Sequence, residues 1–189
     1  CMCRNIVITQ SQFINNTGYS GSGIYMENGI DGLIDKCNFT YNHAKAGGGG
    51  IMTMTSRNIT VDNCRFDNNT AQVGGGQAIY GSDVKITNTQ YTNNHAIWGG
   101  GLVAMYTSTF SPIRVENNVF VNNSATEGGG GMAYISTVSI TVKDTKFFSN
   151  IAHGNGGAIY CENTTDINMY HLQFGGEGLK AGKTCIILL

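Results

Sequence analysis

An aromatic residue recurs seven times along the 189-residue chain, at intervals of 25 to 29 residues. These residues are Phe13, Phe39, Phe66, Tyr91, Phe120, Phe147 and Phe174. In the first six repeats an asparagine follows three positions later, at Asn16, Asn42, Asn69, Asn94, Asn123 and Asn150. A fixed period of this length is typical of a solenoid, in which every repeat forms one coil and the coils stack.

Short strands are predicted on both sides of each aromatic residue. Apolar and polar residues alternate before it, as in residues 58–62, and a glycine-rich stretch followed by a second apolar segment comes after it in the first six repeats. A period of two is typical of β-strands, and no segment shows the sustained 3.6-residue period of a helix. Strands of neighbouring coils pair at about 4.8 Å. We therefore predict an all-β chain, residues 1–189, folded as one right-handed parallel β-helix of about seven coils.

The asparagine and glycine positions have structural explanations. Asparagine tolerates the left-handed backbone conformation required at a sharp corner, and its amide can donate and accept between stacked copies. Glycine provides positive φ and lets neighbouring coils approach closely. Both sets of residues are therefore expected to serve the fold.

Composition narrows the classes of partner. Charged residues make up 12% of the chain, the formal net charge is −1, and Lys and Arg form no run or stripe, so a nucleic-acid partner is not expected. No apolar stretch reaches the roughly 18–20 residues of a membrane-spanning helix. The first residue is Cys1, and the repeats run close to both ends. We expect the chain to be a segment of a longer or processed protein.

Six cysteines suggest an oxidising environment. Cys37 and Cys64 occupy the same position in adjacent repeats, where a disulfide and a pair of buried thiols are equally compatible with stacking. Cys161 and Cys185, near the C-terminal end, are a second candidate disulfide. An even number of cysteines in a chain poor in charge favours an extracellular or cell-surface location. No Cys-x-x-Cys pair occurs, and we expect no metal site and no cofactor.

Six Asn-x-Ser/Thr triplets are candidate N-glycosylation sites. They begin at Asn15, Asn38, Asn58, Asn68, Asn122 and Asn163. Asn15, Asn68 and Asn122 share one position, directly before the repeated asparagine, and strand alternation predicts that this position faces outward. About three triplets would arise by chance, so glycans on this edge are a hypothesis that depends on passage through a eukaryotic secretory route.

Acidic residues were weighed as catalytic candidates, because many β-helix proteins cleave polysaccharides. Asp35 and Asp62 lie four positions before their aromatic residues and are expected to stack about 5 Å apart. Such a pair could hold calcium or act as an acid/base pair. The same row continues with a threonine, a glutamate and a lysine and contains no Arg or His, so a solvated strand face is the favoured interpretation.

Histidines and tyrosines give weaker signals. His43 and His95 share a position but are separated by Thr70, which predicts about 10 Å between them, too far for one metal ion. Four tyrosines follow the glycine-rich stretches, at Tyr25, Tyr80, Tyr134 and Tyr160. They are expected either to seal the core or to form an aromatic face for stacking sugars.

The alternation of Phe-x-x-Asn with Gly-Gly-Ala-Ile matches a known repeat pattern. The best copies are residues 66–69 and 156–159, and looser copies are residues 99–103 and 128–132. These repeats, which extend from about Asn5 to Phe174, resemble those of the chlamydial polymorphic outer-membrane proteins and related β-helix surface proteins. The resemblance implies a surface-exposed β-helix associated with adhesion, and it implies no catalytic residues.

From these observations we expect a non-catalytic extracellular β-helix that acts as an adhesin, a stalk, or a filament or sheath component. Its expected partners are protein or glycan surface ligands, or further copies of itself. The alternative is a polysaccharide lyase or glycoside hydrolase that uses acidic residues such as Asp35 and Asp62.

Overall fold

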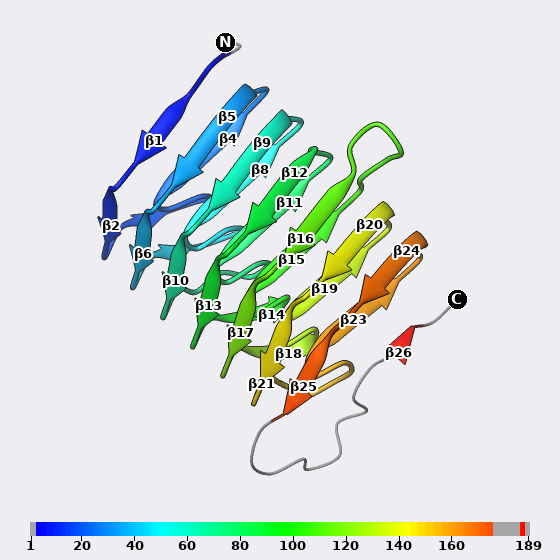
Figure 1. Cartoon of the computed structure of the whole chain (residues 1–189). Helices are drawn as coiled ribbons and strands as arrows, with labels where there is room; N and C mark the ends of the chain where they lie inside the picture. Colours follow the sequence, from blue (N-terminus) through cyan, green and yellow to red (C-terminus); the bar gives the residue numbers. More distant parts are fainter. Residues whose placement is uncertain (1–2, 176–185, 188–189) are drawn as a thin grey trace.

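The computed structural model describes residues 3–175 and 186–187, which form 26 strands and no helix. The strands stack into a β-solenoid in which each coil adds one strand to each of three long parallel sheets (Figure 1). Seven strands in each sheet correspond to about six complete turns, close to the seven coils predicted. The prediction of an all-β parallel solenoid is therefore confirmed.

The three long sheets account for most of the strands. Sheet 1 contains β1 (Val7–Thr9), β5 (Ile30–Asp35), β9 (Arg57–Asp62), β12 (Val84–Thr87), β16 (Ile113–Glu116), β20 (Val138–Lys143) and β24 (Thr165–Tyr170). Sheet 2 contains β2 (Gln12–Ile14), β6 (Asn38–Thr40), β10 (Arg65–Asp67), β13 (Gln90–Thr92), β17 (Val119–Val121), β21 (Lys146–Phe148) and β25 (Gln173–Gly175). Sheet 3 contains β4 (Ile24–Glu27), β8 (Ile51–Met54), β11 (Gln77–Tyr80), β15 (Leu102–Met105), β19 (Met132–Ile135), β23 (Ile159–Glu162) and β26 (Ile186–Ile187).

Shorter strands lie between sheets 2 and 3 along the chain. They are β3 (Thr17–Gly18) with β7 (His43–Ala44), and β14 (His95–Trp98) with β18 (Ser124–Gly128) and β22 (Ile151–Ala152). Trp98 of this segment packs with its ring 5.1 Å from that of Tyr160, on the outer side of sheet 3. Sheet 3 therefore has apolar side chains on both faces, which the alternation pattern did not predict.

The repeated aromatic residues stack through the centre of sheet 2. Phe39 pairs with Phe66, and Phe66 with Tyr91, at equivalent positions of adjacent strands. Successive rings from Phe13 to Phe174 lie nearly parallel, with centroids 4.5–5.3 Å apart and interplanar angles of 2–16°. The register that the 25–29-residue period implies is therefore present in every coil.

The asparagines form a ladder at the corner that follows sheet 2. Asn69 accepts hydrogen bonds at Oδ1 from the backbone N–H and the side-chain Nδ2 of Asn42, both at 3.0 Å. Asn69 in turn donates from Nδ2 to the carbonyl oxygen of Phe39 at 2.9 Å. Corresponding bonds link Asn16 through Asn150, so the predicted ladder is confirmed.

One expectation about this corner is wrong. The left-handed conformation belongs to the residue before each ladder asparagine, for example Asn15 (φ 55°), Tyr41 (φ 57°) and Asn68 (φ 54°). The ladder residues are not among those with positive φ. The preceding residue makes the turn, and the ladder asparagine keeps its N–H directed at the next coil.

Glycine serves both expected purposes, at different positions. Gly48 and Gly74 have φ values of 63° and 62°, in the left-handed region. A Cβ at Gly50 would lie 2.7 Å from Cδ1 of Phe66, and one at Gly76 would lie 2.9 Å from Cδ1 of Tyr91. The second set of glycines therefore gives the aromatic stack the space it occupies.

Candidate functional site

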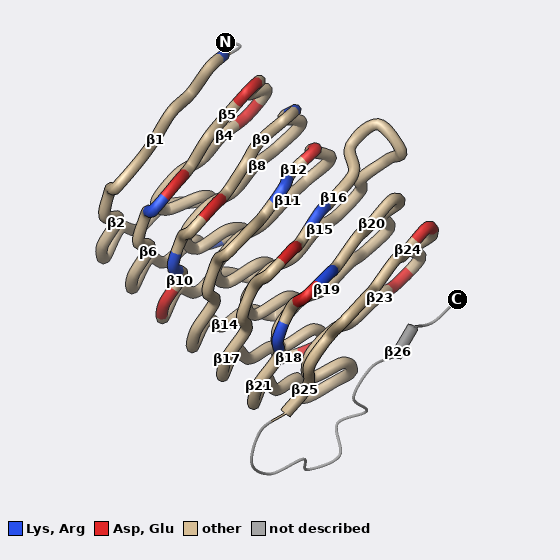
Figure 2. The backbone as a smooth tube through the Cα atoms, in the orientation of Figure 1, with Lys and Arg blue, Asp and Glu red and all other residues tan. Residues whose placement is uncertain are grey.

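The predicted acidic row lies on the outer face of sheet 1. Asp35 pairs in register with Asp62, and Asp62 with Thr87, so the predicted stacking is confirmed. The row continues through Glu116 and Lys143. Acidic and basic positions are distributed over several coils of this face, as Figure 2 shows, and do not gather into a field of one sign.

Asp62 is held by a set of hydrogen bonds from neighbouring side chains. Its Oδ1 accepts from Thr87 Oγ1 at 2.5 Å and from Asn88 Nδ2 at 2.8 Å. Its Oδ2 accepts from Asn63 Nδ2 at 2.8 Å. Burial opposes ionisation of this carboxyl, but the hydrogen bonds from Thr87 and Asn88 outweigh that effect and hold its pKa below the ordinary 3.8. Asp62 is therefore ionised near neutral pH and has no proton to give as a general acid.

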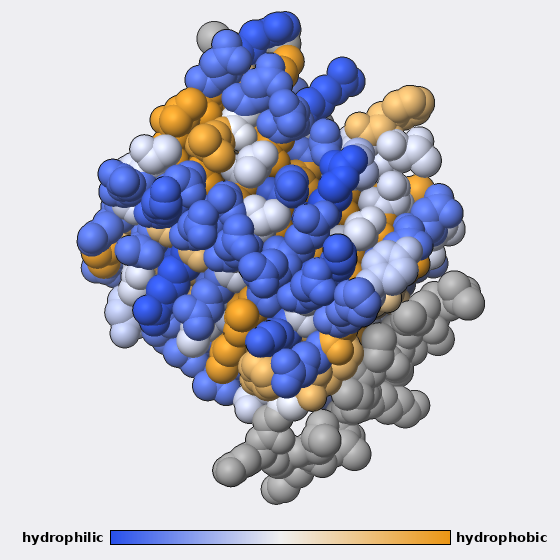
Figure 3. Space-filling model, viewed as in Figure 1, coloured by the Kyte–Doolittle hydropathy of each residue, from blue (hydrophilic) through white to orange (hydrophobic). Residues whose placement is uncertain are grey.

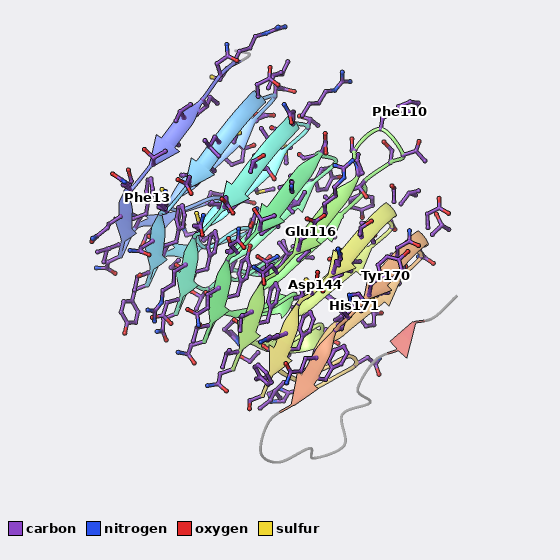
Figure 4. The ribbon with its side chains drawn as sticks, viewed as in Figure 1. Phe13, Phe110, Glu116, Asp144, Tyr170 and His171 are labelled. Atoms are coloured by element: carbon purple, nitrogen blue, oxygen red, sulfur yellow. The ribbon has the colours of Figure 1, made fainter. Side chains whose placement is uncertain are left out.

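The sequence analysis did not identify a second pair of titratable residues at the far end of this face. His171 Nδ1 lies 3.1 Å from Asp144 Oδ1, and both residues occupy the corner position three before the aromatic residue. Tyr170 and Glu116 lie in the adjacent row on sheet 1 (Figure 4). The shared repeat position was visible in the sequence and could have predicted that these side chains meet. No group of three or more Cys, His, Asp or Glu residues suited to a metal ion occurs within the described part of the chain.

His43 and His95 are separated as predicted. Thr70 bridges the two strands on which they lie, and His43 Nδ1 lies 2.6 Å from Thr70 Oγ1. His95 Nδ1 instead lies 2.9 Å from Ser124 Oγ, in the next coil. Each histidine therefore has a hydroxyl neighbour and the two do not share a site.

The candidate disulfide between Cys37 and Cys64 is not formed, which corrects that prediction. The Cys37 thiol donates to the carbonyl oxygen of Asp35 at 3.3 Å, and the Cys64 thiol to that of Asp62 at 3.2 Å. Thr89 makes the same bond with its hydroxyl in the next coil. Cysteine therefore takes the place of a hydroxyl residue in a corner column, and burial raises the pKa of the Cys64 thiol to about 12.

The second candidate disulfide falls partly beyond the described residues. Cys161 is buried in β23, and Cys185 lies outside the ranges that the structure describes. This pairing remains a prediction.

The glycosylation candidates lie at the surface. Five are exposed and the sixth, Asn68, is partly exposed. The exposed five are Asn15, Asn38, Asn58, Asn122 and Asn163. Asn58 donates from Nδ2 to Asp31 Oδ1 at 2.7 Å, whereas no side-chain bond of this kind is recorded for Asn122. The outward orientation predicted for the shared column is confirmed; glycosylation itself stays a prediction.

The four tyrosines do not form one aromatic face, so that interpretation is wrong. Tyr134 lies wholly inside the core, and Tyr160 is buried under Trp98. Tyr25 lies four coils away from Tyr160 along the register of sheet 3, and Tyr80 occupies a different column. Insertions and the two-residue period send equivalent-looking tyrosines to opposite faces of a sheet.

Tyr80 does contribute to an aromatic cluster that was not predicted. Its ring lies 5.0 Å from that of Tyr106, with an interplanar angle of 50°. Phe110, on the loop after β15, projects from the solenoid (Figure 4). The face seen in Figure 3 is otherwise largely hydrophilic, with scattered apolar groups.

Comparison with protein families gives one match. Residues 2–174 match the family described as right handed beta helix region. The chain belongs to the right-handed β-helix family. The match covers all but the last residues of the solenoid and confirms the predicted hand of the fold. It carries no activity of its own, because one β-helix scaffold can support many unrelated functions.

The other comparisons add no relative. Neither the search of curated proteins nor the search of solved structures gives a match. Among the described residues, no helix is long and apolar enough to cross a membrane.

Proposed function

We propose that this β-helix is a non-catalytic extracellular or cell-surface protein that presents a long, repetitive surface, as an adhesin, a stalk or a filament component. The observation that carries the proposal is the state of Asp62. The most plausible catalytic carboxylate of the row is ionised and engaged by three side-chain donors, Thr87, Asn88 and Asn63. Such a carboxylate stabilises its face of the solenoid and has no proton to transfer.

Two further features support an extracellular role. The Asn-x-Ser/Thr triplets lie at exposed positions, where a glycan would meet no obstruction from the core. The Phe-x-x-Asn and Gly-Gly-Ala-Ile repeats also resemble those of chlamydial polymorphic outer-membrane proteins, which are associated with adhesion. The expected partners are protein or glycan surfaces, or other copies of the chain.

Surface labelling tests the location. Antibodies raised against the folded solenoid should label intact source cells or their surrounding matrix without permeabilisation. Labelling that requires permeabilisation would contradict the proposal. Electron microscopy of the native material then separates a filament component, seen as long regular fibres, from a monomeric adhesin.

A second candidate function is cleavage of a polysaccharide, favoured by one observation. Asp144 and His171 form an exposed acid–histidine pair, 3.1 Å apart, beside the row that contains Glu116 and Tyr170. Neutral and uronic-acid polysaccharides should be incubated with the protein while new reducing ends and unsaturated products are followed. Turnover that disappears in Asp62→Asn or His171→Asn would replace the binding proposal with an enzymatic one.

A further inference from the structure

One corner of the solenoid differs from all the others in length. Seven residues, 106–112, connect β15 to β16, whereas two or three residues connect the equivalent strands of the other coils. The Ser111 N–H donates to the carbonyl oxygen of Ser108 at 2.8 Å, which closes a turn with Phe110 inside it. The extra residues therefore form an ordered projection with an aromatic side chain at its tip.

Aromatic residues gather around this projection without serving the core. Tyr106 is 51% exposed, Tyr80 is 38% exposed and Phe110 is 88% exposed. The positions equivalent to Tyr106 in the other coils are polar residues or glycine, namely Asn28, Thr55, Gly81, Ser136 and Asn163. An aromatic ring is therefore not required for this corner to form. Exposed clusters of this kind commonly mark binding sites.

The size of the cluster selects the class of ligand. Aromatic side chains offer about 150–250 Å² each, so the exposed parts of these three rings total on the order of 350 Å². A stable protein–protein interface needs about 800 Å² from each partner. The cluster is too small to hold a second copy of the chain or another folded protein by itself, and it matches a small ligand.

The charge and hydrogen-bonding groups of the corner narrow the ligand further. Residues 107–112 carry no charged side chain but four hydroxyl groups, on Thr107, Ser108, Thr109 and Ser111. The charges at the base of the loop, Asp83 and Arg114, pair with each other at 3.4 Å. A ligand for this corner therefore needs apolar faces for the rings, hydroxyl groups for the loop, and no net charge. Carbohydrates combine these properties.

We propose that Tyr80, Tyr106 and Phe110 form a binding site for a neutral carbohydrate. The inference rests on the proposed function of the solenoid as a binding surface and assigns the ligand class to one corner of it. The tilted rings of Tyr80 and Tyr106 would contact the C–H faces of sugar units, and Phe110 would flank them from the loop.

The test uses binding of defined oligosaccharides to the whole chain. Oligomers of glucose, mannose, galactose and N-acetylglucosamine are titrated calorimetrically, with oligogalacturonate as the anionic comparison. We expect at least one neutral oligomer to bind, and Tyr106→Asn to weaken it about tenfold through loss of ring contact. Asparagine is chosen because Tyr106 has a φ of 55°, which asparagine tolerates.

A matched control lies at another corner. Tyr41 is also exposed and has a φ of 57°, so Tyr41→Asn makes the same change in the same backbone conformation and should leave affinity unchanged. Phe110→Ser provides a second variant that cannot disturb the core and should also weaken binding. Binding of oligogalacturonate alone, no binding of any neutral oligomer, or equal affinity in the Tyr41 and Tyr106 variants would overturn the inference. Surface labelling of cells with any of these results would leave the proposed location intact.

Discussion

The hydroxyl of Tyr91 donates a 2.6 Å hydrogen bond to Oε1 of Gln77 inside the otherwise apolar core. Both side chains are fully buried. Tyr91 stands in the aromatic stack between Phe66 and Phe120, and Gln77 pairs in register with Ile51 on one side. Because each member of the polar pair replaces an apolar residue of adjacent coils, the two residues depend on each other.

A double-mutant cycle at this pair should show strong coupling. Tyr91→Phe leaves the buried oxygen of Gln77 without its donor and should lower the free energy of unfolding by about 1–3 kcal/mol. Gln77→Leu, which strands the tyrosine hydroxyl, should act similarly. The double variant should regain most of the loss, because both positions then match their neighbours. Urea unfolding of the four proteins measures the coupling, and additive losses would contradict it.

The aromatic stack should dominate core stability. Phe66 is fully buried between Phe39 and Tyr91, so Phe66→Ala removes ring contacts on both sides and should destabilise the protein by about 3–5 kcal/mol. Phe110→Ala is the control, since that ring is solvent-exposed and its loss should change stability by less than about 0.5 kcal/mol. Equal unfolding midpoints for the two variants would mean that the stack does not hold the coils together.

The periodic features of the sequence predicted the periodic features of the structure. Phe39, Phe66 and Tyr91 recur at a fixed interval because each must sit over the last, so spacing alone gives their register. Residues that break the repeat were harder to interpret. Tyr134 and Tyr80 both follow glycine-rich stretches, yet a two-residue difference in strand position separates the core from the surface.

Residues with several possible partners were also beyond sequence reasoning. Cys37 and Cys64 stack as predicted, but only the structure reveals carbonyl oxygens within reach of each thiol. The contact between Tyr80 and Tyr106 depends on an insertion that lies outside the repeat. The Asp144–His171 pair, in contrast, occupies one repeat position and was predictable in principle.

The asparagine ladder should be as important as the aromatic stack. Asn69→Ala removes the acceptor of the Asn42 backbone N–H and the donor to the Phe39 carbonyl oxygen. Each buried group left without a partner should cost about 1–3 kcal/mol, giving a total loss of about 2–6 kcal/mol in denaturant unfolding. Asn93→Gly tests the adjacent corner, where glycine accepts the φ of 55°. That variant should lose less than about 1 kcal/mol, and comparable losses in the two would show that the ladder is not special.

Asp62 should make the stability of the solenoid depend on acid pH. Its pKa is below 3.8 in the folded protein, because hydrogen bonds from Thr87 and Asn88 outweigh the effect of burial, and near 3.9 when unfolded. A carboxyl with a depressed folded pKa stabilises the protein above the unfolded pKa, and this contribution is lost as the pH falls through the folded pKa.

The measurement is the unfolding midpoint in urea from pH 6 to pH 2 for the wild type and Asp62→Asn. The destabilisation caused by the substitution should be largest above about pH 4 and should shrink towards pH 2, where the wild-type carboxyl is itself protonated. Asp166→Asn, at an exposed corner, removes one negative charge without removing this set of donors. A difference between Asp62→Asn and the wild type that stays constant over the whole range would mean that the bonds to Thr87 and Asn88 do not favour the ionised form.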